Sequence, residues 1–135
     1  MGSRQITPPE RRRAWAEIDL DALASNAAQL RAALPQFEGA PVVAAHFGGY
    51  MLWREAIEQL CGQDIYFDTS YSARKLPPLW AARIMELHDP ARILFGTDAP
   101  WADPRDEMDF VRKICGGDPA LEAAVFGGNA ERLLS

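Results

Sequence analysis

The chain is poor in cysteine and has no long apolar run, and each shortage excludes a class of protein. Cys61 and Cys115 are its only cysteines and form no Cys-x-x-Cys motif, so we expect neither a disulfide framework nor a thiolate metal site. Both are expected to be small, reduced, buried hydrophobic side chains. No apolar run is long enough to cross a membrane, and no signal-peptide pattern is present. These features predict a cytoplasmic-type protein with no membrane partner.

Positive charge is also scarce. The 135 residues include 14 Lys and Arg against 19 Asp and Glu, a formal net charge of −5, which argues against nucleic acid as a partner. The basic run at residues 11–13 follows a polar, proline-broken stretch, and residues 1–3 are typical of a cloning remnant. We therefore divide the chain into a tag and leader, residues 1–13, and a single α/β domain, residues 14–135.

Short apolar runs alternate with amphipathic helical patterns along this domain. The predicted strand and helix pairs are 14–20 with 22–34, 41–47 with 50–61, 64–70 with 77–88, and 92–99 with 103–115. A further helical segment is expected over 121–126, and Asn129 is expected to cap a last helix. Strands and helices alternating at this spacing predict a parallel sheet with right-handed crossovers.

Polar residues stand where the predicted strands end. His46 closes the second strand, Asp68 and Thr69 the third, and Asp98 the fourth. Because ligands of parallel α/β folds bind at the carboxyl ends of the strands, we expect His46 and Asp98 on one catalytic face. Asp68 and Thr69 are interpreted as turn residues.

Four segments, AHFGG, YFDTS, ILFGTDAPW and FGGNAERLL, occur in this order in the chain. Together they resemble the carboxyl-terminal part of the metal-dependent amidohydrolases, in the "amidohydrolase 2" branch that includes metal-dependent decarboxylases. The resemblance covers about residues 37–135 and implies the last three βα units of a (β/α)8 barrel. It also implies that His46 serves substrate binding or catalysis and that Asp98 binds a metal or moves a proton.

The chain departs from that family in its metal ligands. The family carries a His-x-His pair on its first strand and a histidine on its fifth, whereas His46 and His88 are the only histidines here. His88 is predicted at a helix end, away from the catalytic face. A zinc or manganese ion needs three or four protein ligands. We therefore expect no required cofactor, with zinc or another divalent metal as an alternative if subunits share His46 and Asp98.

Both candidate residues also have a simpler interpretation. His46 could be a polar residue satisfied by hydrogen bonds near the sheet edge. Asp98 could cap the turn and helix that follow it. The residue types alone leave these alternatives open.

The front of the chain carries a different resemblance. Residues 11–35, RRRAWAEIDLDALASNAAQLRAALP, resemble the start of alanine racemase, a pyridoxal-phosphate barrel enzyme. That enzyme needs a cofactor lysine on the next strand, but residues 41–47 contain none. A racemase-like unit, residues 14–36, thus meets an amidohydrolase-like unit, residues 37–135. The junction indicates a man-made chimera, with a natural fusion or a broken reading frame as alternatives.

Four βα units are half of a (β/α)8 barrel. Such a half would expose the apolar layer that a closed barrel buries, here Val43, Ala45, Tyr66, Leu94 and Ile18. Burying this layer would favour association by about 25 cal/mol per Å². We therefore expect self-association, first as a two-fold dimer pairing edge to edge to restore eight strands. An open, flavodoxin-like sheet is the alternative.

The sequence thus favours a recombined, self-associating half-barrel with no evolved catalytic activity. The alternative function is residual metal-dependent hydrolysis or decarboxylation at a site shared between subunits. In a two-fold barrel, two copies each of His46 and Asp98 would converge on a divalent metal.

Overall fold

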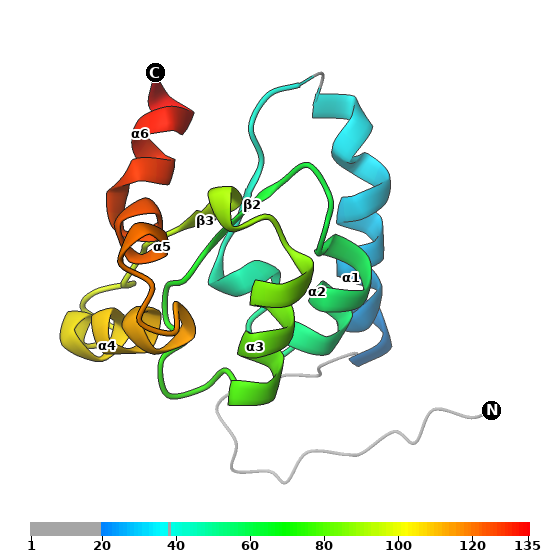
Figure 1. The fold of residues 1–135 in the computed structure, drawn as a ribbon. Coiled ribbons are helices and arrows are strands. Elements are labelled where there is room, and N and C mark those ends of the chain that lie inside the picture. The colour runs from blue at the N-terminus through cyan, green and yellow to red at the C-terminus, as the bar shows by residue number, and fades with distance from the viewer. Residues whose placement is uncertain (1–19, 38) are drawn as a thin grey trace, which may run out of the picture.

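Three short parallel strands form the centre of the computed structural model, which describes residues 20–37 and 39–135 (Figure 1). They are β1 (Val43–Ala44), β2 (Tyr66–Asp68) and β3 (Ile93–Leu94), and they lie side by side in chain order. Within the described residues the sheet is open rather than closed. The fold is therefore a partial α/β barrel.

The first predicted strand falls almost entirely outside the residues that the structure describes. Residues 14–19 of it, including Ile18, lie outside the described part of the chain, and its last residue, Leu20, begins a helix. The first strand of the four-stranded half-barrel therefore stays a prediction.

The predicted helices agree with the observed ones to within three residues at every end. They are α1 (Leu20–Ala33), α2 (Trp53–Leu60), α3 (Pro78–Leu87) and α4 (Pro104–Ile114). Short 3-10 turns lie between them, η1 (Leu34–Phe37), η2 (His46–Gly48) and η3 (Pro90–Arg92). Helix α4 begins as predicted, because the side chain of Asp103 accepts a hydrogen bond from Arg105 N and Pro104 takes the first helical position.

The strands are shorter than predicted. The run 41–47 contains only a two-residue strand, because His46 and Phe47 take left-handed φ angles of 56° and 53° and form η2. His46 therefore lies in a turn beyond the strand rather than at the end of it. The turn forms because the backbone N–H of His46 donates to the carboxylate of Asp68 instead of continuing a ladder.

The two faces of the sheet have different surroundings. Phe67 and Ile93 are paired in register, and both are fully buried in the core that α2 and α3 complete. Side chains alternate along a strand, so Val43, Tyr66 and Leu94 point to the opposite face. Val43 is 46% exposed there, and the other two are half-buried. The predicted exposure of this layer is confirmed for Val43, whereas Tyr66 and Leu94 are only partly exposed.

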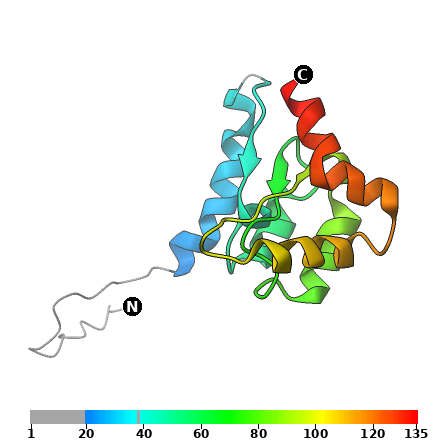
Figure 2. The same cartoon turned by 90° about the vertical axis from the view of Figure 1, so that its left-hand side faces the viewer.

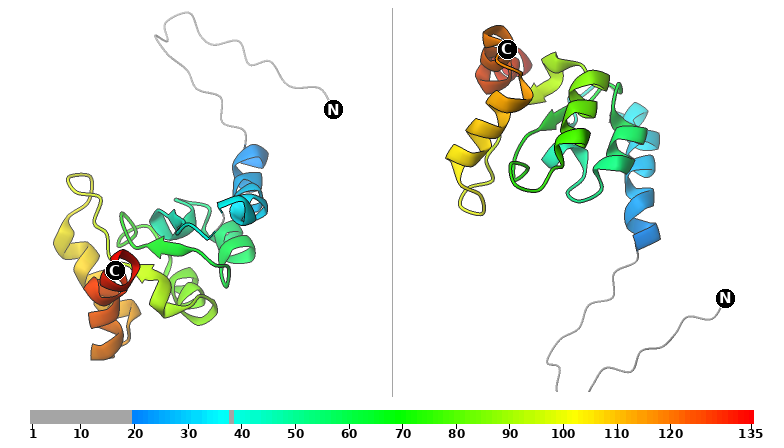
Figure 3. Two further views of the ribbon diagram at one scale, coloured as in Figure 1. Left: turned by 90° about the horizontal axis from the view of Figure 1, so that it is seen from above. Right: turned by 60° about the horizontal axis from the view of Figure 1, so that its bottom comes forward.

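Helices α1, α2 and α3 follow one another around one side of the strands (Figure 3). The side chains of α2 and α3 that face the sheet are apolar and buried, among them Leu60, Ala81 and Ile84. Ala27, Leu30 and Leu34 of the first helical segment pack against this core. The helices therefore bury one face of the sheet and leave the other open.

The carboxyl-terminal segment covers the outer edge of β3. It comprises α5 (Pro119–Ala123), a π-helical turn η4 (Ala124–Gly128) and α6 (Asn129–Leu134). Figure 2 shows this stretch, orange to red, beside the strands on the side away from α1. Phe95 N donates to Val125 O at 3.1 Å, and the side-chain amide of Asn129 donates to Ile93 O at 2.7 Å.

Asn129 does not cap the last helix, which corrects our prediction. The residues on either side of the boundary keep helical φ and ψ, so the chain has no free helix start at this point. The Asn129 side chain is 1% exposed and donates instead to Pro90 O and Ile93 O. Its role is to satisfy backbone carbonyls at the start and edge of β3.

The cysteines are free, as predicted: Cys61 is half-buried and Cys115 buried. Burial raises the pKa of the Cys61 thiol to about 11, and it raises that of Cys115 as well. None of the helices formed by residues 20–37 and 39–135 is both long and apolar enough to span a membrane.

Candidate functional site

Backbone strain gathers at the carboxyl ends of the strands. Among the described residues, the non-glycine positions with positive φ are His46, Phe47, Met51, Tyr71 and Asp98, with φ between 53° and 64°. Each lies in the loop that follows a strand. A side chain held in this region costs about 1–3 kcal/mol and persists only where surrounding contacts fix it. Such positions concentrate at functional sites, so this edge of the sheet is the candidate site.

The carboxylate of Asp68 holds two of these loops together. Its Oδ1 accepts from His46 N and from Ser70 N, each at 3.0 Å, and from the Ser70 hydroxyl at 2.5 Å. Asp68 therefore serves as the turn residue we predicted, and it also links the loop after β1 to the loop after β2.

The His46 ring is fixed by the same loop. Its Nδ1 lies 2.9 Å from both the backbone oxygen and the hydroxyl of Ser70. A carbonyl oxygen can only accept, so Nδ1 carries the proton. The Ser70 hydroxyl gives its own proton to Asp68 and accepts from Nδ1–H with a lone pair. In the neutral ring Nε2 is then unprotonated, which is the state that a metal ligand or a proton acceptor needs.

Aromatic rings surround His46. The rings of Tyr50 and Tyr71 lie 5.4 Å apart, and their centroids are 6.2 Å and 6.1 Å from that of His46. Trp53 donates its indole N–H to His46 O at 3.0 Å. The ammonium group of Lys75 lies 3.6 Å from the ring centroid of Tyr71. The site is thus one imidazole among aromatic side chains with a single cation beside them.

Asp98 is not part of this network. Its side chain is exposed, and its backbone carbonyl accepts from Trp101 N at 2.9 Å and from Ala102 N at 3.3 Å. The helix that follows is capped by Asp103. Our interpretation of Asp98 as a helix cap is therefore wrong, because a residue closer to α4 fills that position.

A metal centre within one chain is not formed by the described residues. No group of three or more His, Cys, Asp or Glu side chains among residues 20–37 and 39–135 is placed to hold a metal ion. His46 and Asp98 both follow strands at the same edge of the sheet, yet they share no hydrogen-bonded partner. Their joint role as ligands from several subunits stays a prediction.

Glu107 of α4 holds the loop after β2, and no pattern in the sequence indicated this role. It is 2% exposed, and its carboxylate accepts from Ser72 N at 3.2 Å and from Ala73 N at 3.2 Å. Burial raises the pKa of Glu107, while the two backbone donors oppose that shift. An acid in the first turn of a helix is usual, so only the three-dimensional contact shows that α4 holds the loop after β2.

Thr69 and His88 have structural roles. The Thr69 hydroxyl donates to Gly96 O and accepts from Gly96 N, both at 3.2 Å, which joins the loops after β2 and β3. His88 is 2% exposed and packs against the buried ring of Phe67 with a centroid distance of 4.3 Å, so it lies on the helix side of the sheet, away from the candidate site as predicted. It accepts from Gly62 N at 3.2 Å, and its Nε2 lies 3.2 Å from Ile65 O. Burial lowers the pKa of His88.

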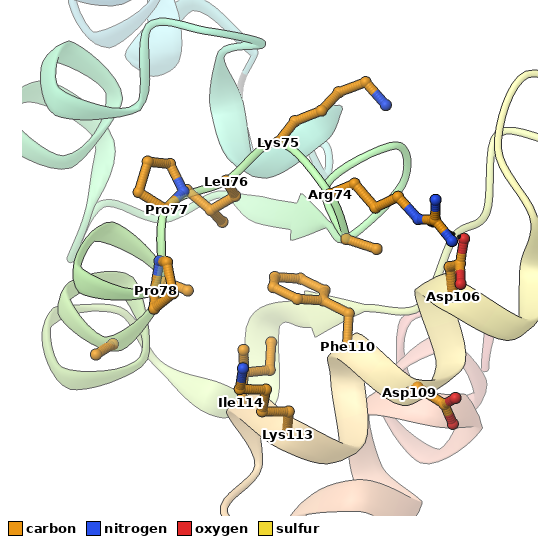
Figure 4. A pocket seen from close by; sticks show the side chains of 13 residues that line it. Arg74, Lys75, Leu76, Pro77, Pro78, Asp106, Asp109, Phe110, Lys113 and Ile114 are labelled. Atoms are coloured by element: carbon orange, nitrogen blue, oxygen red, sulfur yellow. Dashed lines mark ion pairs between the residues drawn. The ribbon is translucent and has the colours of Figure 1, made fainter.

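A second feature is a hollow of about 570 Å³ between α3, α4 and the loop after β2. Figure 4 shows the ring of Phe110 pointing into it, with Pro77 and Pro78 along one wall. At the rim, Arg74 forms an ion pair with Asp106 at 2.8 Å. This hollow is lined mainly by apolar side chains and lies apart from His46.

The features described so far define a partial α/β barrel: an open parallel sheet, helices along one of its faces, and polar residues beyond the strand ends. The chain matches the amidohydrolase family model over residues 5–135, and it belongs to this family. The match extends across the racemase-like residues 11–35 and the predicted junction. A comparison with curated proteins finds no match.

Proposed function

We propose that the chain is a recombined barrel-fragment folding unit, without evolved catalytic activity, that associates with copies of itself. The observation that carries this proposal is the open face of the sheet. Val43, Tyr66 and Leu94 present apolar surface there, and the described helices bury the other face. Apolar surface removed from water contributes about 25 cal/mol per Å², so pairing two such faces is favourable.

The edge of β3 directs how two copies pair. Val125 O and the Asn129 side chain already bond the outward backbone groups of Phe95 and Ile93. A two-fold barrel closed edge to edge would have to break these bonds at both junctions. Contact through the open faces keeps them, so we propose face pairing rather than the edge pairing that the sequence first suggested.

The recombined origin rests on the front of the chain. Residues 11–35 resemble alanine racemase, while residues 41–47 lack the lysine that its cofactor requires. A segment of this kind contributes a cover for the core, through Leu30 of α1 and Leu34 of η1, rather than a catalytic group. We propose that it serves as a structural replacement.

The oligomeric state tests self-association. Light scattering after size exclusion should show a dimer of the full chain. Val43→Lys places a charge on the open face and should give a monomer at the same concentration. Leu79→Lys is the matched control, since Leu79 is 74% exposed on α3 and its replacement should leave the dimer intact. A wild-type monomer at every concentration, or a dimer that Val43→Lys does not weaken, would contradict the proposal.

A second candidate is residual metal-dependent hydrolysis or decarboxylation at a site shared between subunits. The unprotonated Nε2 of His46 favours it, because this atom is the usual metal-binding nitrogen and has no protein partner among the described residues. One chain does not supply a full ligand set, so subunits would have to contribute His46 and Asp98 together.

Elemental analysis on the oligomer peak tests this candidate. Stoichiometric zinc or another divalent metal, lost in both His46→Gln and Asp98→Asn, would support a shared site. Asp109→Asn on α4 is the control and should keep the metal. An oligomer that stays free of metal after incubation with zinc would exclude the candidate.

A further inference from the structure

We propose that the hollow between α3 and α4 is a binding site for a small amphiphilic monoanion, an apolar chain that carries one carboxylate. This inference is independent of the proposed function, because the hollow does not use the open face of the sheet. It rests on the shape, the lining and the charges of the hollow.

The lining suits an apolar chain. Phe110 and Ile114 come from α4, Leu76 from the loop after β2, and Ala81 from α3. The volume of about 570 Å³ lies within the range of roughly 300–1,000 Å³ that is usual for ligand pockets. Helix α3 begins with Pro77 at the N-cap and Pro78 at its first position, and their fixed backbone angles give one wall a rigid shape.

The charged side chains around the hollow leave Lys113 without an ion-pair partner. Asp106 is paired with Arg74 at 2.8 Å, and Asp109 with Arg112 at 2.9 Å. In the part of the chain that the structure describes, Lys113 forms no ion pair. Both carboxylates of the rim are therefore neutralised, and Lys75 and Lys113 are the remaining cations of the lining.

Lys113 is also the cation best placed for a ligand. Its side chain lies beside Ile114 at the mouth of the hollow, whereas Lys75 points away from it (Figure 4). The ammonium group of Lys75 is already held against the ring of Tyr71. One ammonium group above an apolar floor complements one carboxylate on an apolar chain.

Calorimetric titration of the full chain with octanoate tests the proposal. We expect saturable binding at a single site, tightening about fourfold for each added methylene from hexanoate to octanoate. The neutral analogue 1-octanol should bind about two- to fivefold more weakly, since an exposed ion pair contributes a modest part of the affinity. An absence of saturable binding, or no dependence on chain length, would overturn the proposal.

Two variants locate the ligand. Ala82 lines the hollow and is exposed, so Ala82→Phe should fill the space and abolish binding while the circular dichroism spectrum stays unchanged. Lys113→Gln should weaken octanoate by about two- to fivefold and leave 1-octanol unaffected. Arg54→Gln is the control. It removes a positive charge from α2, which contributes no residue to the lining of the hollow, and should change the affinity for neither octanoate nor 1-octanol.

The same variants separate this site from the open sheet face. Val43→Lys should leave octanoate binding unchanged, whatever its effect on self-association. Octanoate affinity that is lost in Val43→Lys and kept in Ala82→Phe would place the ligand on the sheet and overturn the proposal. If Ala82→Phe does not fold, equal weakening of octanoate and 1-octanol by Lys113→Gln would overturn it instead.

Discussion

Adjacent residues on one strand show how differently the two faces of the sheet are used. Phe67 is fully buried against the helices, while Tyr66, one position earlier, lies half-buried on the open face. The guanidinium group of Arg92 lies 5.2 Å from the centroid of the Tyr66 ring. The helix face holds the fold together with residues of one chain. The open face contributes surface without a cover of its own, and the strand ends beyond it carry the candidate site.

Truncating Phe67 and Tyr66 in turn should show the difference between the two faces most clearly. Phe67→Ala removes a fully buried ring and should lower the free energy of unfolding by about 3–5 kcal/mol, which is a large part of the stability of a domain of this size. Tyr66→Ala on the open face should cost less than half as much when both changes are made in the Val43→Lys background, in which the proposed pairing of open faces is blocked. Urea unfolding followed by circular dichroism measures both. Equal losses would mean that the open face is covered in solution as thoroughly as the helix face.

Glu107 links the helix side to the candidate site, and its removal should have the next largest effect. Glu107→Ala leaves the buried N–H group of Ser72 and the partly buried N–H group of Ala73 without their acceptor, at a cost of about 1–3 kcal/mol. Amide hydrogen exchange at these two residues should accelerate. Glu86→Ala is the control, since that carboxylate is on the surface in an ion pair with Arg83, and it should change little. Unchanged exchange in Glu107→Ala would contradict the role of Glu107.

The buried histidine gives the helix side a pH dependence. Burial lowers the pKa of His88 from its ordinary value of 6.5 in the folded state, so below pH 6.5 the unfolded chain binds more protons than the folded one. The free energy of unfolding should therefore fall as the pH drops below 6.5, and the fall should end once the pH lies below the pKa of His88 in the folded state. Thermal unfolding between pH 7.5 and pH 5 measures this fall.

His88→Gln should flatten that profile, because it removes the titrating group while keeping polar atoms near Gly62 and Ile65. Glu107 works in the opposite direction, since its raised pKa makes the folded state bind more protons. A wild-type profile that His88→Gln leaves unchanged would assign the acid sensitivity to another group.

The smallest expected effect concerns the single ring proton of neutral His46 at the candidate site. Long-range proton–nitrogen correlation spectra of neutral His46 should show Nδ1 protonated and Nε2 unprotonated. Ser70→Ala should keep this tautomer, because the backbone oxygen of Ser70 still accepts from Nδ1. A spectrum with the proton on Nε2 would remove the support for metal binding at that atom.

Local sequence signals predicted the helices well. The spacing of apolar residues and the pair Asp103 and Pro104 place the start of α4 correctly, since caps and first-turn prolines act within a few residues. The choice of Tyr66 and Leu94 for the open face also follows from local alternation. These features depend on neighbours in the chain.

The strand ends and the support of the site depend on distant residues. The left-handed turn at His46 forms through Asp68, and Glu107 reaches Ser72 across 35 positions. Asn129 bonds Ile93 across 36 positions, which no capping rule contains. Contacts of this range give no periodic signal, so a single sequence could not show them.

The bonds that Asn129 and Val125 make to β3 also bear on how the protein behaves at high concentration. Exposed strand edges template the addition of further strands, and this is how cross-β fibres grow. Here the chain's own last turns occupy that edge, so strands of other copies find no unpaired groups on β3. The pairing of open faces that we propose would end when two faces have met, and the occupied edge of β3 prevents growth without limit from this side of the sheet.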